Sequence, residues 1–456
     1  MRACCLLALA ACGASSHPAK PATPAPTATP LPGVAPEAAG SRVLLVVTGY
    51  SSGEDEIAAP ALAKGYCSGA IAVLEPARAV ADEHFKCKGT PVRELRDFIP
   101  TAKTKLLVTD LDHVTAQLKA LPVDGVSFFA HPAEYPLVLG SPRPNFRPHL
   151  THFIMTGVTA ITRATGAACE QKGIAWLTQN LRPHFEDADY VHISNEVSIK
   201  ADCKYPVKST YQFCTKEGDF QALIDLHANL VELTGNHTRD FGDEPFRRTM
   251  DWYKAHDIKT FGGGLTPEQA NEPVIVPLAD GKKLGIIGFN EQCPLKECAL
   301  KPNEVGANAW DSAKAKAAIA RMRELGADFI IVTVQFREVD SAEPTRPQTT
   351  ISHELIDLGV DLVYGSQAHQ LQVVEFYQGK PIFHGLGNLL FDQIHRIGVR
   401  QAFFLHHYFF HGKLVQSVPV FTFMADDRQP PIATPDQTAV MKDIIFRDEL
   451  LYSVGR

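Results

Sequence analysis

The sequence lacks an excess of positive charge. Its 456 residues include 44 Lys and Arg against 51 Asp and Glu, and the formal net charge is −7. A surface that binds nucleic acid normally carries clustered Lys and Arg side chains that neutralise the phosphates. We therefore expect no nucleic-acid partner, and a polyanionic partner would need a local basic cleft.

Cysteine pairs of the Cys-x-x-Cys type are also absent, which argues against a thiolate metal site. The cysteines after residue 12 include three pairs that are close in sequence. They are Cys67 with Cys87, Cys203 with Cys214, and Cys293 with Cys298. We predict that each pair forms a disulfide that closes a short loop, as is common in an oxidising compartment, and that Cys169 stays free.

The N-terminal segment MRACCLLALAACGASS lacks an apolar run long enough to span a bilayer. A basic residue, a short apolar stretch and the run Leu-Ala-Ala-Cys are typical of a bacterial lipoprotein signal. We predict a signal peptide at 1–11, a lipid anchor on Cys12 that holds the protein to a membrane, and a Pro/Ala-rich tether at 12–41. The predicted location is extracytoplasmic, in the periplasm or at the cell surface. The alternative is a free N-terminus in which this spacing arose by chance.

The remaining chain divides near residue 150. Apolar stretches at 42–50, 106–114 and 123–131 are typical of strands, and helical stretches separate them. No phosphate-binding loop pattern occurs among them. We predict a small α/β domain at 42–147, a Pro-rich linker at its end, and a second domain at 150–456.

The second domain repeats a strand, a polar loop and a helix. It then continues with hairpins at 373–385 and 401–423. This order predicts a mixed sheet or two packed sheets with helices outside. Loops at the carboxyl ends of strands gather at one edge of such sheets. The polar residues at those ends are Glu196, Asn236, His237 and His369.

Three segments carry a family resemblance. The first, GNHTRDFG (235–242), resembles the NHxxDxG signature of the CapA-like proteins of capsule and poly-γ-glutamate synthesis. The second, ISNEVS (193–198), resembles another segment of these proteins, and residues 361–393 resemble their closing block. The resemblance covers roughly residues 150 to 400. It implies a metallophosphoesterase-like αββα sandwich, here preceded by the small N-terminal α/β domain. It also implies divalent metals at the strand-end loops.

This chain departs from the family pattern at three expected metal ligands. Val158 replaces a carboxylate, and Gln335 and Gln367 replace histidines. Val cannot coordinate a metal, and a glutamine carbonyl is a poorer ligand than imidazole or carboxylate. What survives by resemblance is a site for a single divalent ion, Mn, Mg, Zn or Fe. Its ligands would be Glu196, Asn236 and His369.

The resemblance also suggests roles for other residues. His237, oriented by Asp240, would donate a proton to a departing oxygen. Arg163 and Asn388 would bind the substrate, Arg163 through an anionic group. The alternative is that Asn236 and Asp240 only bond the loop backbone and that His237 is a satisfied polar residue.

Two functions follow, and the sequence leaves the choice between them open. The first is a metal-assisted hydrolase or transferase that acts on an anionic cell-envelope polymer or its precursor. The second is a catalytically degenerate module that binds such a polymer at the cell surface.

Overall fold

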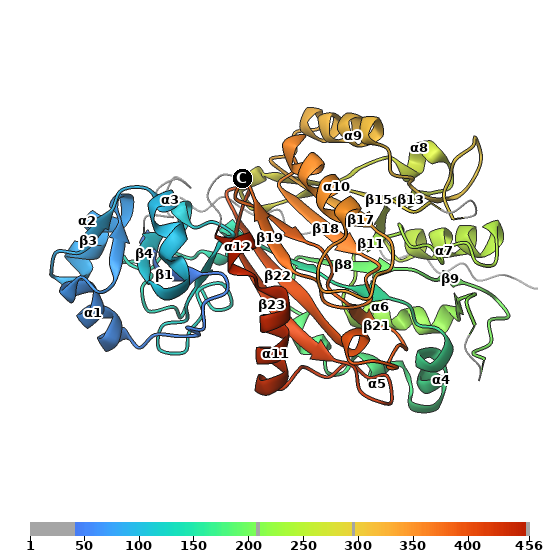
Figure 1. Ribbon diagram of the computed structural model, residues 1–456, viewed down its shortest axis with the longest axis horizontal. Coiled ribbons are helices and arrows are strands. Elements are labelled where there is room, and N and C mark those ends of the chain that lie inside the picture. The colour runs from blue at the N-terminus through green and yellow to red at the C-terminus, as the bar shows by residue number, and fades with distance from the viewer. Residues whose placement is uncertain (1–41, 207–209, 294–296, 453–456) are drawn as a thin grey trace, which may run out of the picture. The chain divides into compact units, whose positions relative to one another are not determined.

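The computed structural model describes residues 42–206, 210–293 and 297–452 (Figure 1). The predicted signal peptide, Cys12 and the tether lie outside these residues. All the described residues belong to one compact unit. None of the helices in these three ranges is both long and apolar enough to cross a bilayer.

The N-terminal part carries a mixed five-stranded sheet of order β3-β2-β4-β1-β5. Its strands are β1 (Leu44–Gly49), β2 (Ala72–Leu74), β3 (Thr90–Val92), β4 (Leu107–Asp110) and β5 (Leu118–Ala120). Its helices are α1 (Ala59–Ser68), α2 (Glu75–Phe85) and α3 (Leu95–Phe98). The predicted disulfide between Cys67 and Cys87 joins α1 to the segment after α2.

Two predictions for this part are wrong. The stretch 123–131 is not a strand, because Asp124 and Gly125 both adopt positive φ (50° and 77°) and reverse the chain there. The predicted linker is not an open spacer, because Phe146 is only 1% exposed. Phe146 shares one hydrophobic cluster with Tyr408 and Phe410 of the later chain. Prolines in that segment restrict the backbone without preventing its side chains from packing.

The later chain forms an eight-stranded sheet, the first sheet, with the path β12-β11-β8-β6-β22-β23 and with β7 and β21 beside it. These strands are β6 (Leu150–Met155), β7 (Val158–Thr159), β8 (Tyr190–Asn195), β11 (Leu230–Glu232), β12 (Lys259–Phe261), β21 (Asn388–Leu390), β22 (Gln401–Phe410) and β23 (Lys413–Phe423). Strands β6, β8, β11 and β12 run parallel, and β22 and β23 form the predicted hairpin.

A second, six-stranded sheet has the order β14-β15-β17-β18-β20-β19. Its strands are β14 (Val274–Pro277), β15 (Lys283–Asn290), β17 (Phe329–Gln335), β18 (Leu362–Ser366), β19 (Val374–Tyr377) and β20 (Lys380–Phe383). Two small pairs complete the strands, β9 (Ser198–Ile199) with β10 (Cys214–Thr215) and β13 (Gly263–Gly264) with β16 (Gly306–Ala307).

The two sheets pack face to face. One buried cluster contains side chains from both sheets, including Met155 and Leu405 of the first and Ile331 and Tyr364 of the second. Helices α4 (Arg163–Lys172), α5 (Ile174–Thr178), α6 (Gln221–Asp225) and α7 (Asp243–Ala255) belong to the cluster on the outer face of the first sheet. Helices α9 (Ser312–Glu324) and α10 (Arg346–Asp357) cover the second sheet (Figure 1). The predicted αββα sandwich is therefore confirmed.

Shorter or terminal helices are α8 (Pro267–Ala270), α11 (Pro435–Ile445) and α12 (Asp448–Leu451). The other two predicted disulfides are present, with S–S distances of 1.98 Å (Cys203–Cys214) and 1.93 Å (Cys293–Cys298). Cys169 is buried and free, as predicted.

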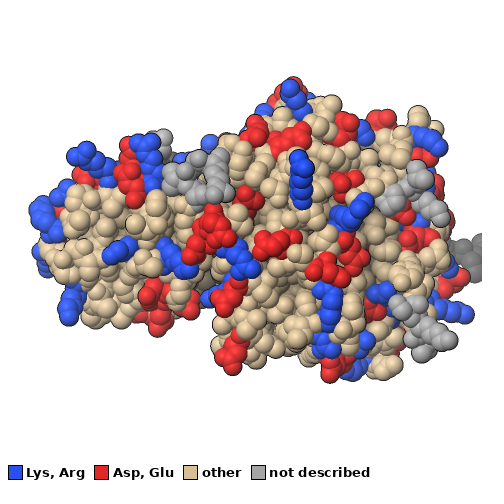
Figure 2. All heavy atoms as spheres, viewed as in Figure 1, with Lys and Arg blue, Asp and Glu red and all other residues tan. Residues whose placement is uncertain are grey.

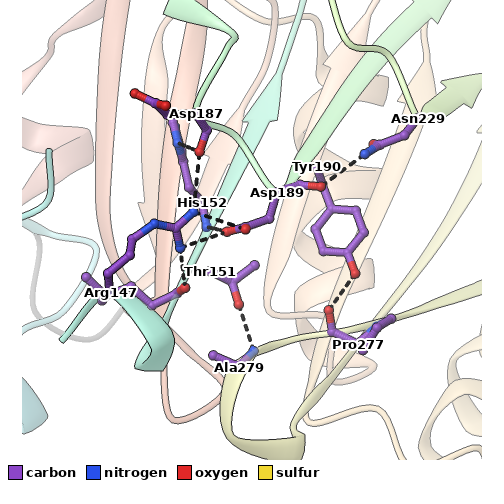
Figure 3. A network of polar contacts seen from close by, with 10 residues as sticks. Arg147, Thr151, His152, Asp187, Asp189, Tyr190, Asn229, Pro277 and Ala279 are labelled. Atoms are coloured by element: carbon purple, nitrogen blue, oxygen red, sulfur yellow. Dashed lines mark hydrogen bonds and ion pairs between the residues drawn. The ribbon is translucent and has the colours of Figure 1, made fainter. Parts of the chain in front are cut away.

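A polar network ties the two sheets together at the amino ends of β6 and β8 (Figure 3). Arg147 donates to both carboxylate oxygens of Asp189, and Asp189 also accepts from the backbone N–H of His152 at 2.8 Å. Tyr190 donates its hydroxyl to the carbonyl of Pro277 in β14 at 2.7 Å. The carboxylate of Asp189 is thus fully hydrogen-bonded at this end of the sandwich.

Candidate functional site

The loop after β11 holds the predicted His237 and Asp240 in direct contact. His237 Nδ1 lies 2.7 Å from Asp240 Oδ2, which also accepts from the backbone N–H of Phe213. The His237 ring stacks on Phe213 with a centroid distance of 3.8 Å. Because a carboxylate only accepts, Nδ1 is the donor, and Nε2 is left free to face a ligand. The geometry keeps an oriented imidazole at this strand end.

Glu196 follows β8 and is completely buried. Neither of its carboxylate oxygens has a hydrogen-bond partner within the described residues. Burial raises the pKa of Glu196 to about 7, and the smaller opposing effect of the nearby His237 does not cancel this rise. A buried and unpaired carboxylate is costly, so its presence beside the loop marks a functional position.

His369 follows β18 and is 3% exposed. Its Nδ1 lies 2.8 Å from Asn388 Oδ1, and the Asn388 amino group donates to the carbonyls of His369 and Val399. Because those two carbonyls fix the amide orientation, Nδ1 of His369 must donate and Nε2 carries the lone pair. Burial lowers the pKa of His369 to about 4, so the ring is neutral at pH 7. Asn388 therefore positions His369.

Arg163 begins α4 and is 9% exposed. Its Nε and Nη2 donate to the two carboxylate oxygens of Asp392, and its Nη1 donates to the carbonyl of Thr210. The guanidinium also lies over the rings of Phe213 and Phe391, 4.3 and 5.0 Å from their centroids. The structure thus places this predicted anion-binding residue in a buried ion pair, where it fixes Phe213 under His237.

A cavity of about 180 Å³ lies where the carboxyl ends of β11, β15, β17 and β18 meet. Its lining includes Asn236, Gln335 and Gln367, two of which stand at the altered ligand positions. Gln335 Nε2 donates to Asn236 Oδ1 at 2.9 Å and to Gln367 Oε1 at 2.7 Å. We call these three side chains the amide triad. The predicted Asn236 therefore lines the cavity, and its side-chain oxygen accepts a hydrogen bond from the amide of Gln335.

The segment that contains these residues matches the model of a known protein family. The model of the family described as "Bacterial capsule synthesis protein PGA_cap" matches residues 152–393, which contain every strand-end residue described above. The chain belongs to the PGA_cap family. The relatives of this PGA_cap chain include two CapA proteins of Bacillus.

The "PGA biosynthesis protein CapA" of Bacillus subtilis is 26% identical over 226 residues, which are 49% of this chain and 59% of that protein. The "Capsule biosynthesis protein CapA" of Bacillus anthracis is 20% identical over 295 residues, 64% of this chain and 72% of that protein. The PGA_cap chain therefore spans about three fifths of the first of these relatives.

Among solved structures, the calcineurin-like phosphoesterase YfkN from Bacillus subtilis aligns with a TM-score of 0.36 and 12% identity. The alignment covers 64% of this chain and 98% of the other. The fold assignment rests on the two packed sheets and the core of the PGA_cap chain itself.

The donor set of this PGA_cap chain does not fit the divalent ion that the resemblance implies. Nowhere in 42–206, 210–293 or 297–452 do three His, Cys, Asp or Glu side chains gather so that they could hold a metal ion. The oxygen of Asn236 already accepts from Gln335, and Val158 is a buried alkyl group. A hard divalent cation needs several oxygen ligands or imidazoles in one sphere. We therefore assign no chemical step to a metal.

Sequence reasoning missed three functional contacts in this site. Phe213 supports His237, Asp392 neutralises Arg163, and Gln335 organises the amide triad. From the sequence alone, Gln335 and Gln367 are only replacements of metal ligands. The sequence signal for this contact is that both replaced metal ligands are glutamines, whose side-chain amides can hydrogen-bond to each other.

Proposed function

We propose that the chain is an extracytoplasmic accessory protein of capsule or poly-γ-glutamate synthesis, which binds an anionic envelope polymer or its precursor in the cavity of the amide triad. The observation that carries this proposal is that Asn236, Gln335 and Gln367, which come from three separate parts of the PGA_cap segment, line one cavity. Asn236 and Gln367 come from two different strand-end loops, yet both bond to Gln335. Ligand sites in open sheets occupy such strand ends.

The charge distribution fits a local rather than a global attraction for an anion. On the face drawn in Figure 2, Lys and Arg are interspersed with Asp and Glu instead of forming one basic field. Arg337 lines the cavity and is exposed. An anionic ligand would be recognised by the Arg337 guanidinium at the rim, which stands beside the carboxylate of Glu338 in the same lining, with the rest of the binding supplied by polar contacts inside.

The extracytoplasmic location is supported by three disulfides, which persist in oxidising compartments. We further propose that Cys12 carries a lipid anchor. Mass spectrometry of the N-terminal peptide from membrane fractions would show an acylated Cys12. Release of a Cys12→Ala variant into the soluble fraction is the expected outcome, and an unchanged membrane association would contradict the anchor.

Calorimetric titration of the purified chain tests the binding function. The probes are poly-γ-glutamate and a polyphosphate, each with EDTA present. We expect poly-γ-glutamate to bind, and we expect His237→Ala, next to the cavity-lining Asn236, to weaken that binding about tenfold, which corresponds to about 1.4 kcal/mol. His256→Ala is the matched control, because His256 is exposed on the far end of α7. A folded wild type that binds neither polymer would remove the proposal.

A second function is favoured by one observation, the pairing of His237 with Asp240. An imidazole held by a carboxylate can donate a proton to a departing oxygen. The purified chain would then release products from a phosphoester or a γ-glutamyl polymer. His237→Ala and Asp240→Asn would each lower that rate at least tenfold, and an absence of turnover in the wild type leaves binding alone.

A further inference from the structure

A second cavity, of about 390 Å³, shares no lining residue with the cavity at the strand ends. Small-molecule sites are usually cavities of about 300–1,000 Å³ that combine aromatic side chains with a few convergent polar groups. Four residues of the lining are histidines, namely His131, His152, His184 and His406. None of the strand-end residues described above belongs to this lining, so the cavity needs an account of its own.

Strands β6 and β22 supply one wall of the cavity. Tyr408 stands opposite His152 in the register of these strands, and His406 is two residues earlier in β22, so the three side chains share one face. Ile154 and Phe404 continue the same rows and belong to the cluster on the outer face of the first sheet. The cavity therefore lies on the outer face of the first sheet.

His152 and His406 form a hydrogen-bonded pair with a defined direction. His152 Nδ1 lies 3.3 Å from the carbonyl oxygen of Asp187, so Nδ1 donates and Nε2 carries the lone pair (Figure 3). His406 Nδ1 lies 2.7 Å from His152 Nε2 and must donate to it. Burial lowers the pKa of both imidazoles, so both rings are neutral at pH 7. The remaining nitrogen, His406 Nε2, is therefore an acceptor.

His406 Nε2 and the Tyr408 hydroxyl are left for a ligand. Both residues are 9% exposed and line the cavity, and neither atom has a hydrogen-bond partner in the described part of the chain. Both atoms keep accessible surface, whereas Nε2 of the neighbouring His407 is fully buried. The Tyr408 ring is fixed by stacking on Phe129 and His152, with centroid distances of 5.1 and 4.6 Å. The wall thus offers a fixed acceptor and a hydroxyl that can donate or accept.

The cavity has no unpaired positive charge to attract an anion. Arg147 uses all four terminal N–H groups, two toward Asp189 and one each toward the carbonyls of Leu150 and Asp187. The carboxylate of Asp187, which also belongs to the lining, would repel an anion. In the three described ranges, no three His, Cys, Asp or Glu side chains are placed to hold a metal ion. An uncharged ligand fits these groups best.

Sugar hydroxyl groups both donate and accept, so a saccharide can use the acceptor and the hydroxyl of this wall together. The C–H groups of a sugar ring can pack on Phe129 and Leu150 in the same lining. We infer that this cavity is a binding site for a neutral saccharide, recognised through His406 Nε2 and the Tyr408 hydroxyl. The inference goes beyond the proposed function, because it adds a second site, for an uncharged ligand, on another face of the protein.

Ligand-observed NMR on the full chain tests the site, because it detects weak binding. The probes are two neutral trisaccharides, chitotriose and cellotriose, and one charged trisaccharide, trigalacturonate. We expect at least one neutral trisaccharide to bind at least tenfold more tightly than trigalacturonate. The monomers N-acetylglucosamine and glucose are measured beside them. Tighter binding of a trimer than of its monomer supports a glycan chain as the source of the ligand, and equal binding supports a free sugar.

Two variants remove the proposed contacts singly. His406→Asn keeps a donor toward His152 Nε2 but lacks the acceptor that faces the cavity, and we expect it to weaken saccharide binding at least tenfold. Tyr408→Phe keeps the stacked ring and lacks only the hydroxyl, and we expect it to weaken binding about fivefold. Tyr408→Phe still tests the site if His406→Asn does not fold.

Each variant has a matched control on a residue outside the cavity. His407→Asn changes the next residue of β22, whose Nδ1 lies 2.8 Å from Ser417 Oγ on the opposite face. Tyr190→Phe removes a hydroxyl that donates to the carbonyl of Pro277. Both controls should bind the saccharide as tightly as the wild type does.

Three results would overturn the inference. They are no binding of either neutral trisaccharide by the folded wild type, equal binding of trigalacturonate, and an unchanged affinity in either folded variant. Titration with poly-γ-glutamate, run separately on His406→Asn and Tyr408→Phe, should give the wild-type affinity. The saccharide site and the proposed polymer function can therefore fail independently of each other.

Discussion

The two ends of the sandwich treat buried polar groups in opposite ways. At the amino ends of β6 and β8, Asp189 accepts from Arg147 and from the backbone of His152 (Figure 3). At the carboxyl ends of β8 and β17, the oxygens of Glu196 and Oε1 of Gln335 are buried and have no partner in the part of the chain that the structure describes. The satisfied end stabilises the fold, and the unsatisfied end holds groups available to a ligand.

A buried ion pair beside the strand-end site, Arg163 with Asp392, gives the largest expected effect. Asp392→Ala leaves Arg163 buried without its counter-ion, and we expect a loss of about 3–5 kcal/mol in the free energy of unfolding. Denaturant titration measures it. The control Asp427→Ala removes the partner of exposed Lys172 and should cost less than about 1 kcal/mol. Equal losses in the two variants would contradict the assignment of Arg163 as a structural cation.

The histidines near the satisfied end should make the fold acid-labile. Burial lowers the pKa of His406 to about 3, with smaller contributions from His152, His184 and His407. The unfolded chain binds a proton near pH 6.5 while the folded chain does not, so stability falls as pH drops below about 6.5.

His406 alone should account for about 2 kcal/mol of this loss at pH 5, since each proton contributes about 1.4 kcal/mol per pH unit. The variant His406→Asn keeps a donor toward His152 Nε2 and should flatten the pH profile of the free energy of unfolding. A profile as steep as that of the wild type would exclude His406 as its origin.

Removing a partner at the amino end should have a smaller effect. Asp189→Ala takes an acceptor from Arg147, which is partly exposed, and from one backbone N–H. We expect a loss of about 1–2 kcal/mol in thermal or denaturant unfolding, without any change in polymer affinity. A change in affinity with an unchanged stability would reverse the roles given to the two ends.

The smallest effect on stability is expected at the unsatisfied end. Glu196→Gln removes a buried, unpaired carboxylate and keeps its volume, so the free energy of unfolding should stay within about 1 kcal/mol of wild type or rise. Calorimetric melting measures it. A loss comparable to that of Asp392→Ala would mean that Glu196 has a structural partner.

Some features were predictable because they depend on neighbours in the sequence. The three disulfides join cysteines 20, 11 and 5 residues apart, and the two predicted hairpins turn at Gly379 and Gly412. The contact of His237 with Asp240 spans one turn of a loop. The strand at 123–131 was mispredicted because its apolar residues pack around a turn rather than along a sheet face.

By itself, the sequence determined the family, the alternation of strands and helices, and the strand ends at which polar residues stand. Only the tertiary structure decided which of those residues meet. Gln335 bonds Asn236 across 99 residues of chain, and Arg163 bonds Asp392 across 229. Which of these distant residues bond depends on how the two sheets pack and on which donors and acceptors then lie within hydrogen-bond distance. Local sequence patterns do not determine those contacts.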